Sequence, residues 1–135
     1  MSNIVLDASA VLAMIQGEPG GERVEALLDA MELGAGGKVA ICSVNWCEVL
    51  TRTRRDNDGM TAQELPAALC GVELVPFGRV DAEVAAGYAQ VNQALSLGDR
   101  ACLALAKTLR ATAWTAERLW SRIPLDVPIE LIRTY

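Results

Sequence analysis

Short apolar runs alternate with longer segments of helical periodicity along this chain. The first run, Ile4 to Asp7, is apolar without interruption up to its last residue, as in a parallel strand that is covered on both faces. Similar runs predict strands at residues 39–43, 73–76 and 112–115, and residues 129–132 are a candidate fifth strand. The chain therefore offers four or five short strands with other elements between them.

Six segments between these runs have the apolar spacing of helices. Thr61 and Glu64 form a T-x-x-E capping box, which predicts the start of the fourth helix. The DNDG sequence at residues 56–59 predicts a turn before it. The predicted helices are residues 9–15, 22–33, 44–55, 61–69, 81–95 and 99–109.

Strands that alternate with helices are typical of an α/β fold with a mostly parallel central sheet. The length of 135 residues suits one hydrophobic core, and the chain shows no repeat, linker or low-complexity tract. We therefore expect a single domain over residues 1–135. In sheets of this kind, sites form beyond the carboxyl ends of the strands, which is where Asp7 stands.

The amino-acid composition limits the kinds of catalytic and metal-binding site that the chain can form. The chain has no histidine, which excludes Ser-His-Asp catalysis, Cys-His catalysis and histidine metal ligands. Its net charge of −5 counts against a general affinity for nucleic acid, because phosphate binding normally depends on Lys and Arg. That argument concerns the whole surface, so a metal-dependent site with a local basic surface stays compatible with it.

The cysteines and the hydropathy suggest where the protein works. The four cysteines form no C-x-x-C pair and lie in apolar surroundings, so we expect buried free thiols in a reducing cytosol. No uncharged run approaches the ~20 residues of a membrane span, and the N-terminus has no basic leader. These features predict a soluble, cytoplasmic protein without a membrane partner.

Acidic residues stand at the strand ends and helix starts, where an α/β sheet presents its functional groups. If the strands are parallel neighbours, all of these carboxylates face one cleft. Capping explains any one of them, but not why several apolar segments each carry an acid. The candidate catalytic and metal-binding residues are Asp7, Glu48, Asp99 and Glu117.

Each acid also has a simpler interpretation. Asp7 is a possible N-cap of the first helix. Glu48 is placed to pair with Arg52 at i, i+4, a contact that contributes ~0.5 kcal/mol at most. Ser96 and Asp99 match a capping box, and the fourth acid is a possible surface glutamate.

Converging carboxylates repel one another, and some of them must stay protonated unless a cation is present. Sites built from oxygen ligands suit Mg²⁺ or Mn²⁺. Such an ion activates a water molecule and stabilises charge on a phosphodiester. The pattern therefore leads to a hypothesis of metal-dependent phosphodiester hydrolysis, which needs no histidine.

Four segments together carry a family resemblance, and they are IVLDASAVLAMI, SVNWCEVL, LSLGDRACLALA and TAWTAERLW. In this order and at this length, the chain resembles a PIN-domain ribonuclease of the VapC type, the toxin of a type II toxin–antitoxin pair. The resemblance implies a three-layer α/β/α fold with a central, mostly parallel sheet. It also implies RNA cleavage that depends on Mg²⁺ or Mn²⁺.

The resemblance assigns roles to individual residues. Asp7, Glu48 and Asp99 match the metal-site acids of the family, and Ser9 matches the hydroxyl beside the first acid. The fourth acid of the family is commonly an Asp that follows Thr-Ala. Here Thr115 and Ala116 match, but Glu117 replaces the aspartate, so its longer side chain reaches further or leaves room for a water.

The resemblance further implies a homodimer, an RNA substrate and a cognate antitoxin of the VapB type, whose C-terminal segment blocks the toxin. A negative pocket suits a basic side chain from that segment. RNA also needs local positive contacts, and the candidates are Arg52, Arg54, Arg55 and Arg100. The first three have the alternative role of cations that favour the C-terminus of a helix.

Two other functions remain open from the sequence. One is a small-molecule phosphatase with Asp7 as its nucleophile, although Ser9 stands where the D-x-D pattern of such enzymes has a second aspartate. It predicts a phosphoenzyme. The other is a non-catalytic interaction domain on the same fold, which predicts weak metal binding and no effect of Asp7→Asn on cell growth.

Overall fold

The sheet is made of five short strands that all run parallel. The structure is a computed structural model, and it describes residues 3–34, 36–56 and 64–134. Within these residues the strand order is β3-β2-β1-β4-β5. The strands are β1 (Ile4–Leu6), β2 (Val39–Cys42), β3 (Glu73–Val75), β4 (Thr112–Thr115) and β5 (Ile129–Leu131).

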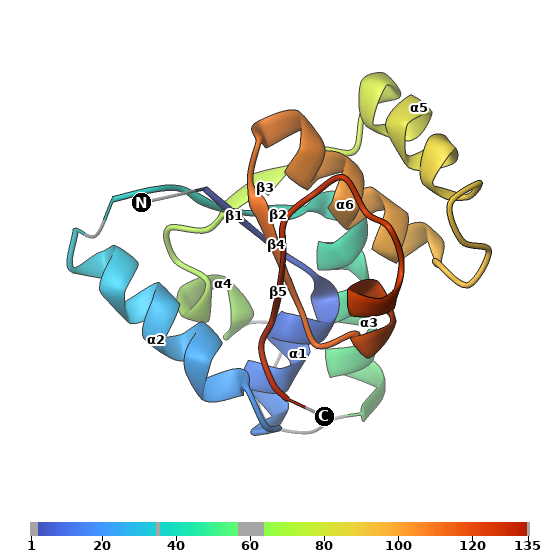
Figure 1. Cartoon of the computed structure of the whole chain (residues 1–135). Coiled ribbons are helices and arrows are strands. Elements are labelled where there is room, and N and C mark those ends of the chain that lie inside the picture. The colour runs from blue at the N-terminus through green and yellow to red at the C-terminus, as the bar shows by residue number, and fades with distance from the viewer. Residues whose placement is uncertain (1–2, 35, 57–63, 135) are drawn as a thin grey trace.

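Helices cover both faces of this sheet. Figure 1 shows the sheet through the middle of the molecule, with α2 and α4 on one side and α5 and α6 on the other. No helix in the described part of the chain is long and apolar enough to span a bilayer. The helices are α1 (Ala8–Gln16), α2 (Gly21–Glu32), α3 (Ser43–Asp56), α4 (Leu65–Ala68), α5 (Arg79–Tyr88), α6 (Leu97–Leu109) and the 3₁₀ helix η1 (Arg118–Arg122).

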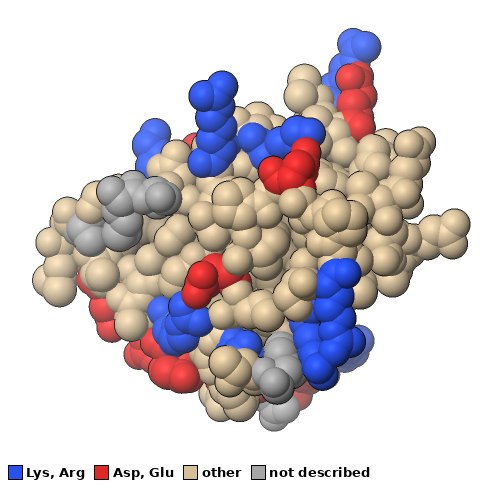
Figure 2. All heavy atoms as spheres, in the orientation of Figure 1, with Lys and Arg blue, Asp and Glu red and all other residues tan. Residues whose placement is uncertain are grey.

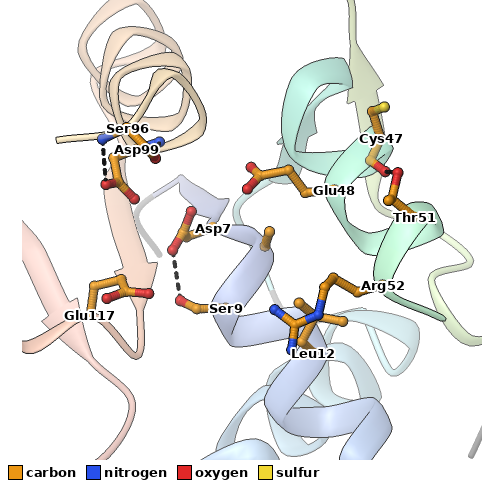
Figure 3. Close-up of a pocket in the computed structure, with 11 residues that line it drawn as sticks. Asp7, Ser9, Leu12, Cys47, Glu48, Thr51, Arg52, Ser96, Asp99 and Glu117 are labelled. Carbon is orange, nitrogen blue, oxygen red and sulfur yellow. Dashed lines mark hydrogen bonds between the residues drawn. The ribbon is translucent and has the colours of Figure 1, made fainter. Parts of the chain in front are cut away.

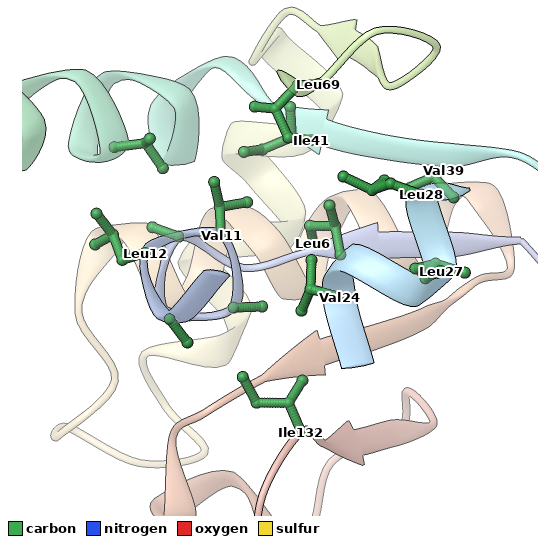
Figure 4. Packing of buried hydrophobic residues seen from close by; sticks show 14 of the residues in the cluster. Leu6, Val11, Leu12, Val24, Leu27, Leu28, Val39, Ile41, Leu69 and Ile132 are labelled. Atoms are coloured by element: carbon green, nitrogen blue, oxygen red, sulfur yellow. The ribbon is translucent and has the colours of Figure 1, made fainter. Parts of the chain in front are cut away.

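The continuous apolar runs of the strands are explained by two separate cores. Leu6 of β1 packs with Val11 of α1 and Val24 of α2 on one face of the sheet (Figure 4). Val5, the neighbour of Leu6, points to the opposite face and packs in a second core with Leu103 of α6. Successive side chains of a strand alternate between faces, so a strand buried on both sides has no polar position. The expected three-layer α/β/α fold is confirmed.

The chain order places a natural binding site at the centre of the sheet. From β1 the chain builds β2 and then β3 on one side, and it later builds β4 and β5 on the other side. The strand order therefore reverses between β1 and β4. Ligands of open α/β sheets bind at such a switch point, outside the carboxyl ends of the strands.

All five predicted strands are present, but several helices have other bounds than predicted. Helix α4, predicted over residues 61–69, spans Leu65–Ala68 among the described residues. The predicted helix at 81–95 ends at Tyr88, and residues beyond it form turns. Tyr88 is buried, and Asn92 Oδ1 accepts a hydrogen bond of 2.8 Å from the Ala94 amide, so the side chain of Asn92 competes with the helix for backbone donors. Leu95 then returns to the core.

Helix α6 begins at Leu97 rather than Asp99, because Ser96 serves as its N-cap. The 3₁₀ helix η1 was not predicted. The capping residue Thr61 and most of the predicted DNDG turn lie outside the described residues. All four cysteines are free in the described chain, but the prediction that they are buried is wrong for Cys47 and Cys70, which are exposed.

Candidate active site

A hollow of about 510 Å³ opens at the carboxyl edge of the sheet, beside the switch point. All four predicted acids line it, together with Ser9 and Arg52. Figure 3 shows that the four carboxylates approach it from different elements and point toward a shared space. The acids at its wall are Asp7, Glu48, Asp99 and Glu117.

Asp7 follows β1 directly and occupies the N-cap position of α1, yet its side chain makes no capping hydrogen bond. Its Oδ2 instead accepts hydrogen bonds from the Ser9 hydroxyl at 2.6 Å and from the Thr115 hydroxyl at 2.9 Å. The residue is only 3% exposed. The simpler interpretation of Asp7 as a helix cap is therefore wrong, because its carboxylate is held across the switch point by β4.

Backbone amides fix the direction of both hydroxyls. Ser9 Oγ accepts a hydrogen bond of 2.9 Å from the Ala116 amide, and Thr115 Oγ1 accepts one of 2.9 Å from the Glu117 amide. A hydroxyl that accepts from a backbone donor keeps its own proton for another acceptor. Both protons are directed to Asp7, so the two hydroxyls stabilise its ionised form.

Asn45 completes this wall of the hollow, and the sequence prediction missed it. The residue is fully buried on α3, and its Nδ2 donates hydrogen bonds of 3.0 Å to Glu48 Oε1 and 3.0 Å to the Gly98 carbonyl oxygen. The same Nδ2 lies 3.5 Å from Asp7 Oδ1. The available signal was an amide three positions before Glu48 in an otherwise apolar stretch, the spacing at which helical side chains meet.

Gly98 makes room for the carboxylate of Glu48. A Cβ atom at position 98 would lie 2.1 Å from Glu48 Oε1, far inside contact distance. The suggested pairing of Glu48 with Arg52 is not what the structure has, since Arg52 Nε lies 3.4 Å from Asp56 Oδ2. Glu48 is thus placed by Asn45 and by the absence of a side chain at Gly98.

Asp99 serves two purposes. Its Oδ2 accepts a hydrogen bond of 2.9 Å from the Ser96 amide, while Ser96 Oγ accepts one of 3.1 Å from the Asp99 amide. The capping box suggested by the sequence is therefore present, and the same carboxylate lines the hollow. Glu117 precedes η1 without capping it and is exposed to solvent.

The acids raise one another's pKa values. Burial raises the pKa of Asp7 to about 7, the charges of Asp99 and Glu48 add to that rise, and the two hydroxyls oppose it. Glu48 and Glu117 are exposed overall, but the part of each side chain that faces the hollow is desolvated. This desolvation raises the pKa of Glu48, with Asp99 and Glu117 adding to the rise, and it raises the pKa of Glu117, with Asp99 adding to the rise. The hollow therefore concentrates negative charge that a cation would stabilise.

The donor chemistry fits a hydrated divalent cation. Within the described residues, no group of three or more Asp, Glu or Cys side chains is arranged to hold one metal ion by itself. Mg²⁺ needs fewer protein ligands, because it keeps several waters and commonly binds one or two carboxylates. Asp7 and Asp99 are suitable carboxylates, with Glu48 and Glu117 within the same hollow.

The candidate RNA-binding arginines are not all at the hollow. Arg52 lines it, whereas Arg54, Arg55 and Arg100 do not. Arg55 is exposed near the end of α3, and its Nε lies 3.1 Å from Asp56 Oδ1. The Nε of Arg100 is buried without a hydrogen-bond partner among the described residues.

Comparison with known proteins identifies the family. The family model described as the PIN domain matches residues 4–125, which is nearly the whole chain. The chain belongs to the PIN domain family. The resemblance drawn from the four sequence segments is thereby confirmed. PIN domains are generally nucleases that depend on divalent metal ions, which agrees with the chemistry of the acids.

Three solved structures share the fold of this PIN domain. A toxin–antitoxin complex from Klebsiella pneumoniae has a TM-score of 0.75 at 19% identity, over 98% of this chain and 100% of that chain. VapBC2 from Rickettsia felis, bound to a DNA fragment from its promoter, has a TM-score of 0.69 at 17% identity, over 95% and 97% of the two chains.

FitAcB from Neisseria gonorrhoeae has a TM-score of 0.67 at 21% identity, over 96% of this PIN domain and 97% of that chain. No curated protein sequence matches this PIN domain significantly. At such identities the three structures show a common fold.

Proposed function

We propose that this PIN domain is an endoribonuclease that depends on Mg²⁺ or Mn²⁺ and acts as the toxin of a type II toxin–antitoxin pair. The observation that carries the proposal is the convergence of four carboxylates at the switch point, with the pKa values of Asp7, Glu48 and Glu117 raised. Family membership supports nuclease chemistry, and the toxin–antitoxin complexes that share the fold support the toxin role.

Each residue of the site has a distinct task in this proposal. Asp7 and Asp99 would hold the cation, with Glu48 and Glu117 as further acids of the same hollow. A cation bound there supplies an activated water and stabilises negative charge on the scissile phosphate. Thr115, like Ser9, favours the ionised form of Asp7 and orients its carboxylate through a hydroxyl hydrogen bond.

The proposal extends to the partners and the place of action. The chain would form one domain over residues 1–135, pair as a homodimer and work in the cytoplasm. A cognate antitoxin of the VapB type would inhibit it, because a basic side chain is attracted to the acids of the hollow. The toxin–antitoxin complexes among the similar structures support such a partner.

The geometry argues against the phosphatase alternative. A carboxylate nucleophile must reach its substrate, but Asp7 is only 3% exposed and both hydroxyl donors bind one of its oxygens.

The decisive experiment compares single-stranded RNA cleavage by the wild type, Asp99→Asn and the control Asp29→Asn, an exposed acid on α2, with Mg²⁺ or Mn²⁺ and with EDTA. Asparagine at 99 can still accept from the Ser96 amide, so α6 keeps its cap. We expect metal-dependent cleavage that falls by more than about 100-fold in Asp99→Asn and is unchanged in Asp29→Asn.

Other results of this experiment would contradict the proposed function or favour one of its alternatives. Cleavage that persists in EDTA, or in Asp99→Asn, contradicts the carboxylate mechanism. Hydrolysis of small phosphate esters through a phosphoenzyme would favour the phosphatase. A folded wild type without either activity would favour the interaction domain, as would normal growth of cells that express it without an antitoxin.

Removing the Thr115 hydroxyl should weaken metal binding without unfolding the protein. Thr115→Val keeps the shape of the side chain but deletes a hydrogen bond that stabilises ionised Asp7. Loss of such a supporting contact typically lowers metal affinity about 10- to 100-fold, so we expect the affinity of the variant for Mn²⁺ to fall by about that factor. Mn²⁺ titration measures the affinity. Thr112→Val, at the start of the same strand, is the control; an equal effect of both variants would mean that the strand itself was disturbed.

A further inference from the structure

A second hollow of about 430 Å³ lies next to the acidic one. The two share Ser9, Leu12, Arg52 and Glu117 as wall residues, so they are neighbours along the same edge of the sheet. The second hollow adds Arg118 and Arg133, and we call it the arginine pocket after Arg52, Arg118 and Arg133. Glu18 and Glu117 also line it, and Arg52 Nε lies 3.4 Å from Asp56 Oδ2.

The fold brings these three arginines together from distant parts of the chain. Arg52 is on α3, Arg118 is the first residue of η1, and Arg133 follows β5. Figure 3 shows the guanidinium of Arg52 beside Leu12, one of the residues common to both hollows. Arg133 Nη1 donates a hydrogen bond of 3.2 Å to the Pro19 carbonyl oxygen, which anchors its side chain at the start of α2.

The charge of the arginine pocket also acts on one of the acids, Glu117. The pKa of Glu117 is raised by burial and by Asp99, and the positive charge of Arg133 opposes that rise. A strand of nucleic acid that reaches the acidic hollow would meet the side chains of Arg118 and Arg133 beyond Glu117. Figure 2 shows no continuous basic band on the face it displays, where acidic and basic side chains are interspersed.

We propose that the arginine pocket binds a phosphate of the RNA strand that neighbours the phosphate cleaved in the acidic hollow. This inference rests on the proposed ribonuclease function. Guanidinium groups are suited to the role, because their fork of N–H donors matches the oxygens of a phosphate and stays charged at every working pH. A chain with a net charge of −5 needs such a local contact to retain RNA.

The position of the pocket also sets the register of the bound RNA strand. Since the two hollows share a wall, a phosphate held by Arg118 and Arg133 fixes how far the strand extends past the acids. The pocket would act on binding and register, and the acids would act on the bond that breaks. The substrate class that fits is a single strand, whose backbone can bend from one hollow into the next.

The test uses Arg118→Gln, Arg133→Gln and the double variant, with Arg79→Gln on α5 as the control, since Arg79 is exposed and lines neither hollow. Binding of a labelled single-stranded RNA is measured by fluorescence anisotropy in EDTA over a range of salt concentrations. The salt slope is the slope of the logarithm of the binding constant against the logarithm of the salt concentration, and each phosphate contact contributes about 0.7 to its magnitude for a single strand. We expect each single variant to lose about that amount and the double variant about twice as much.

Steady-state cleavage gives a second readout. We expect the KM of the double variant to rise about 10-fold or more, since hydrogen bonds to charged groups are lost, while kcat stays within about twofold of the wild type. Arg133→Lys keeps the charge, so it should retain most of the salt slope even if the bond to Pro19 is lost. Thermal unfolding of every variant shows whether Arg133→Gln has disturbed the fold instead.

The outcomes separate this inference from the proposed function. If the wild type cleaves RNA and the double variant keeps its salt slope and KM, the pocket does not bind phosphate. If the slope falls in Arg79→Gln as much as in the pocket variants, the contacts are general and the inference is overturned. If the wild type does not cleave RNA, the proposed function fails, while a slope change confined to the pocket variants would still support phosphate binding.

Discussion

Asp7→Asn is expected to lose RNA cleavage and, at the same time, to make the metal-free protein more stable at pH 8. The loss should exceed about 100-fold, because removal of a residue that merely supports a metal ligand already costs 10- to 100-fold. Asparagine keeps the shape of the side chain and still accepts hydrogen bonds from Ser9 and Thr115. What it removes is the negative charge that the cation needs.

The gain in stability follows from the pKa of Asp7, which is raised by burial from 3.8 to about 7 in the folded protein. Between these two values the folded chain keeps a proton that the unfolded chain releases, so stability falls as pH rises from about 4 to about 7. Above pH 7 the buried charge of Asp7 lowers the free energy of unfolding by its full amount. A rise of about three pKa units corresponds to a cost on the order of 4 kcal/mol.

Urea unfolding in EDTA at pH 4.5, 6 and 8 measures this difference. We expect Asp7→Asn to exceed the wild type by roughly 2 to 4 kcal/mol at pH 8 and to approach it at pH 4.5. Saturating Mg²⁺ should then restore the wild type by about 2.7 kcal/mol at 100 times its Kd, but not the variant. A variant that is less stable than the wild type at pH 8 would show that Asp7 is not a destabilising charge.

Gly98→Ala should reduce cleavage by about 10- to 100-fold with little change in thermal stability. The new Cβ would lie 2.1 Å from Glu48 Oε1 and 2.6 Å from its Cδ, so one partner has to move. The nearest atoms belong to the end of a flexible side chain, which is exposed and can turn away at low cost. Glu48 would then leave the hollow and its hydrogen bond with Asn45.

The matched control for this prediction is Gly87→Ala, because nothing lies within 4 Å of a Cβ at that helical position. It should keep full activity and gain about 0.4–1 kcal/mol of stability. If displacement of Glu48 is the cause, Gly98→Ala should have no further effect in a Glu48→Ala background. A large fall in the melting temperature of Gly98→Ala would instead mean that the backbone of α6 had moved.

Features that depend on the local pattern of residues, and on position within a strand, could be predicted from the sequence. Ile4–Leu6 could be read as a buried parallel strand because it has no polar position, and Asp7 could be read as a site residue because it ends that strand. Both inferences use neighbours in the chain and the general geometry of parallel sheets. They extend to the other acids for the same reason.

The supporting contacts could not be predicted in this way. Asn45 matters because α6 brings the Gly98 carbonyl oxygen against it, and that packing depends on residues more than 50 positions away. The arginine pocket likewise joins three arginines that have no common motif. The helix predicted to continue to residue 95 ends at Tyr88 because local turns around Asn92 compete with it.

The contact between Asp7 and Thr115 has a consequence for the synthesis of the protein. The two residues are 108 positions apart, and β4 must lie beside β1 before their hydrogen bond can form. A nascent chain therefore displays Asp7 long before its β4 partner Thr115, and Glu117, have been made. On the proposed function, RNA cleavage has to await the pairing of β4 with β1, and an antitoxin made alongside the chain meets a newly completed site.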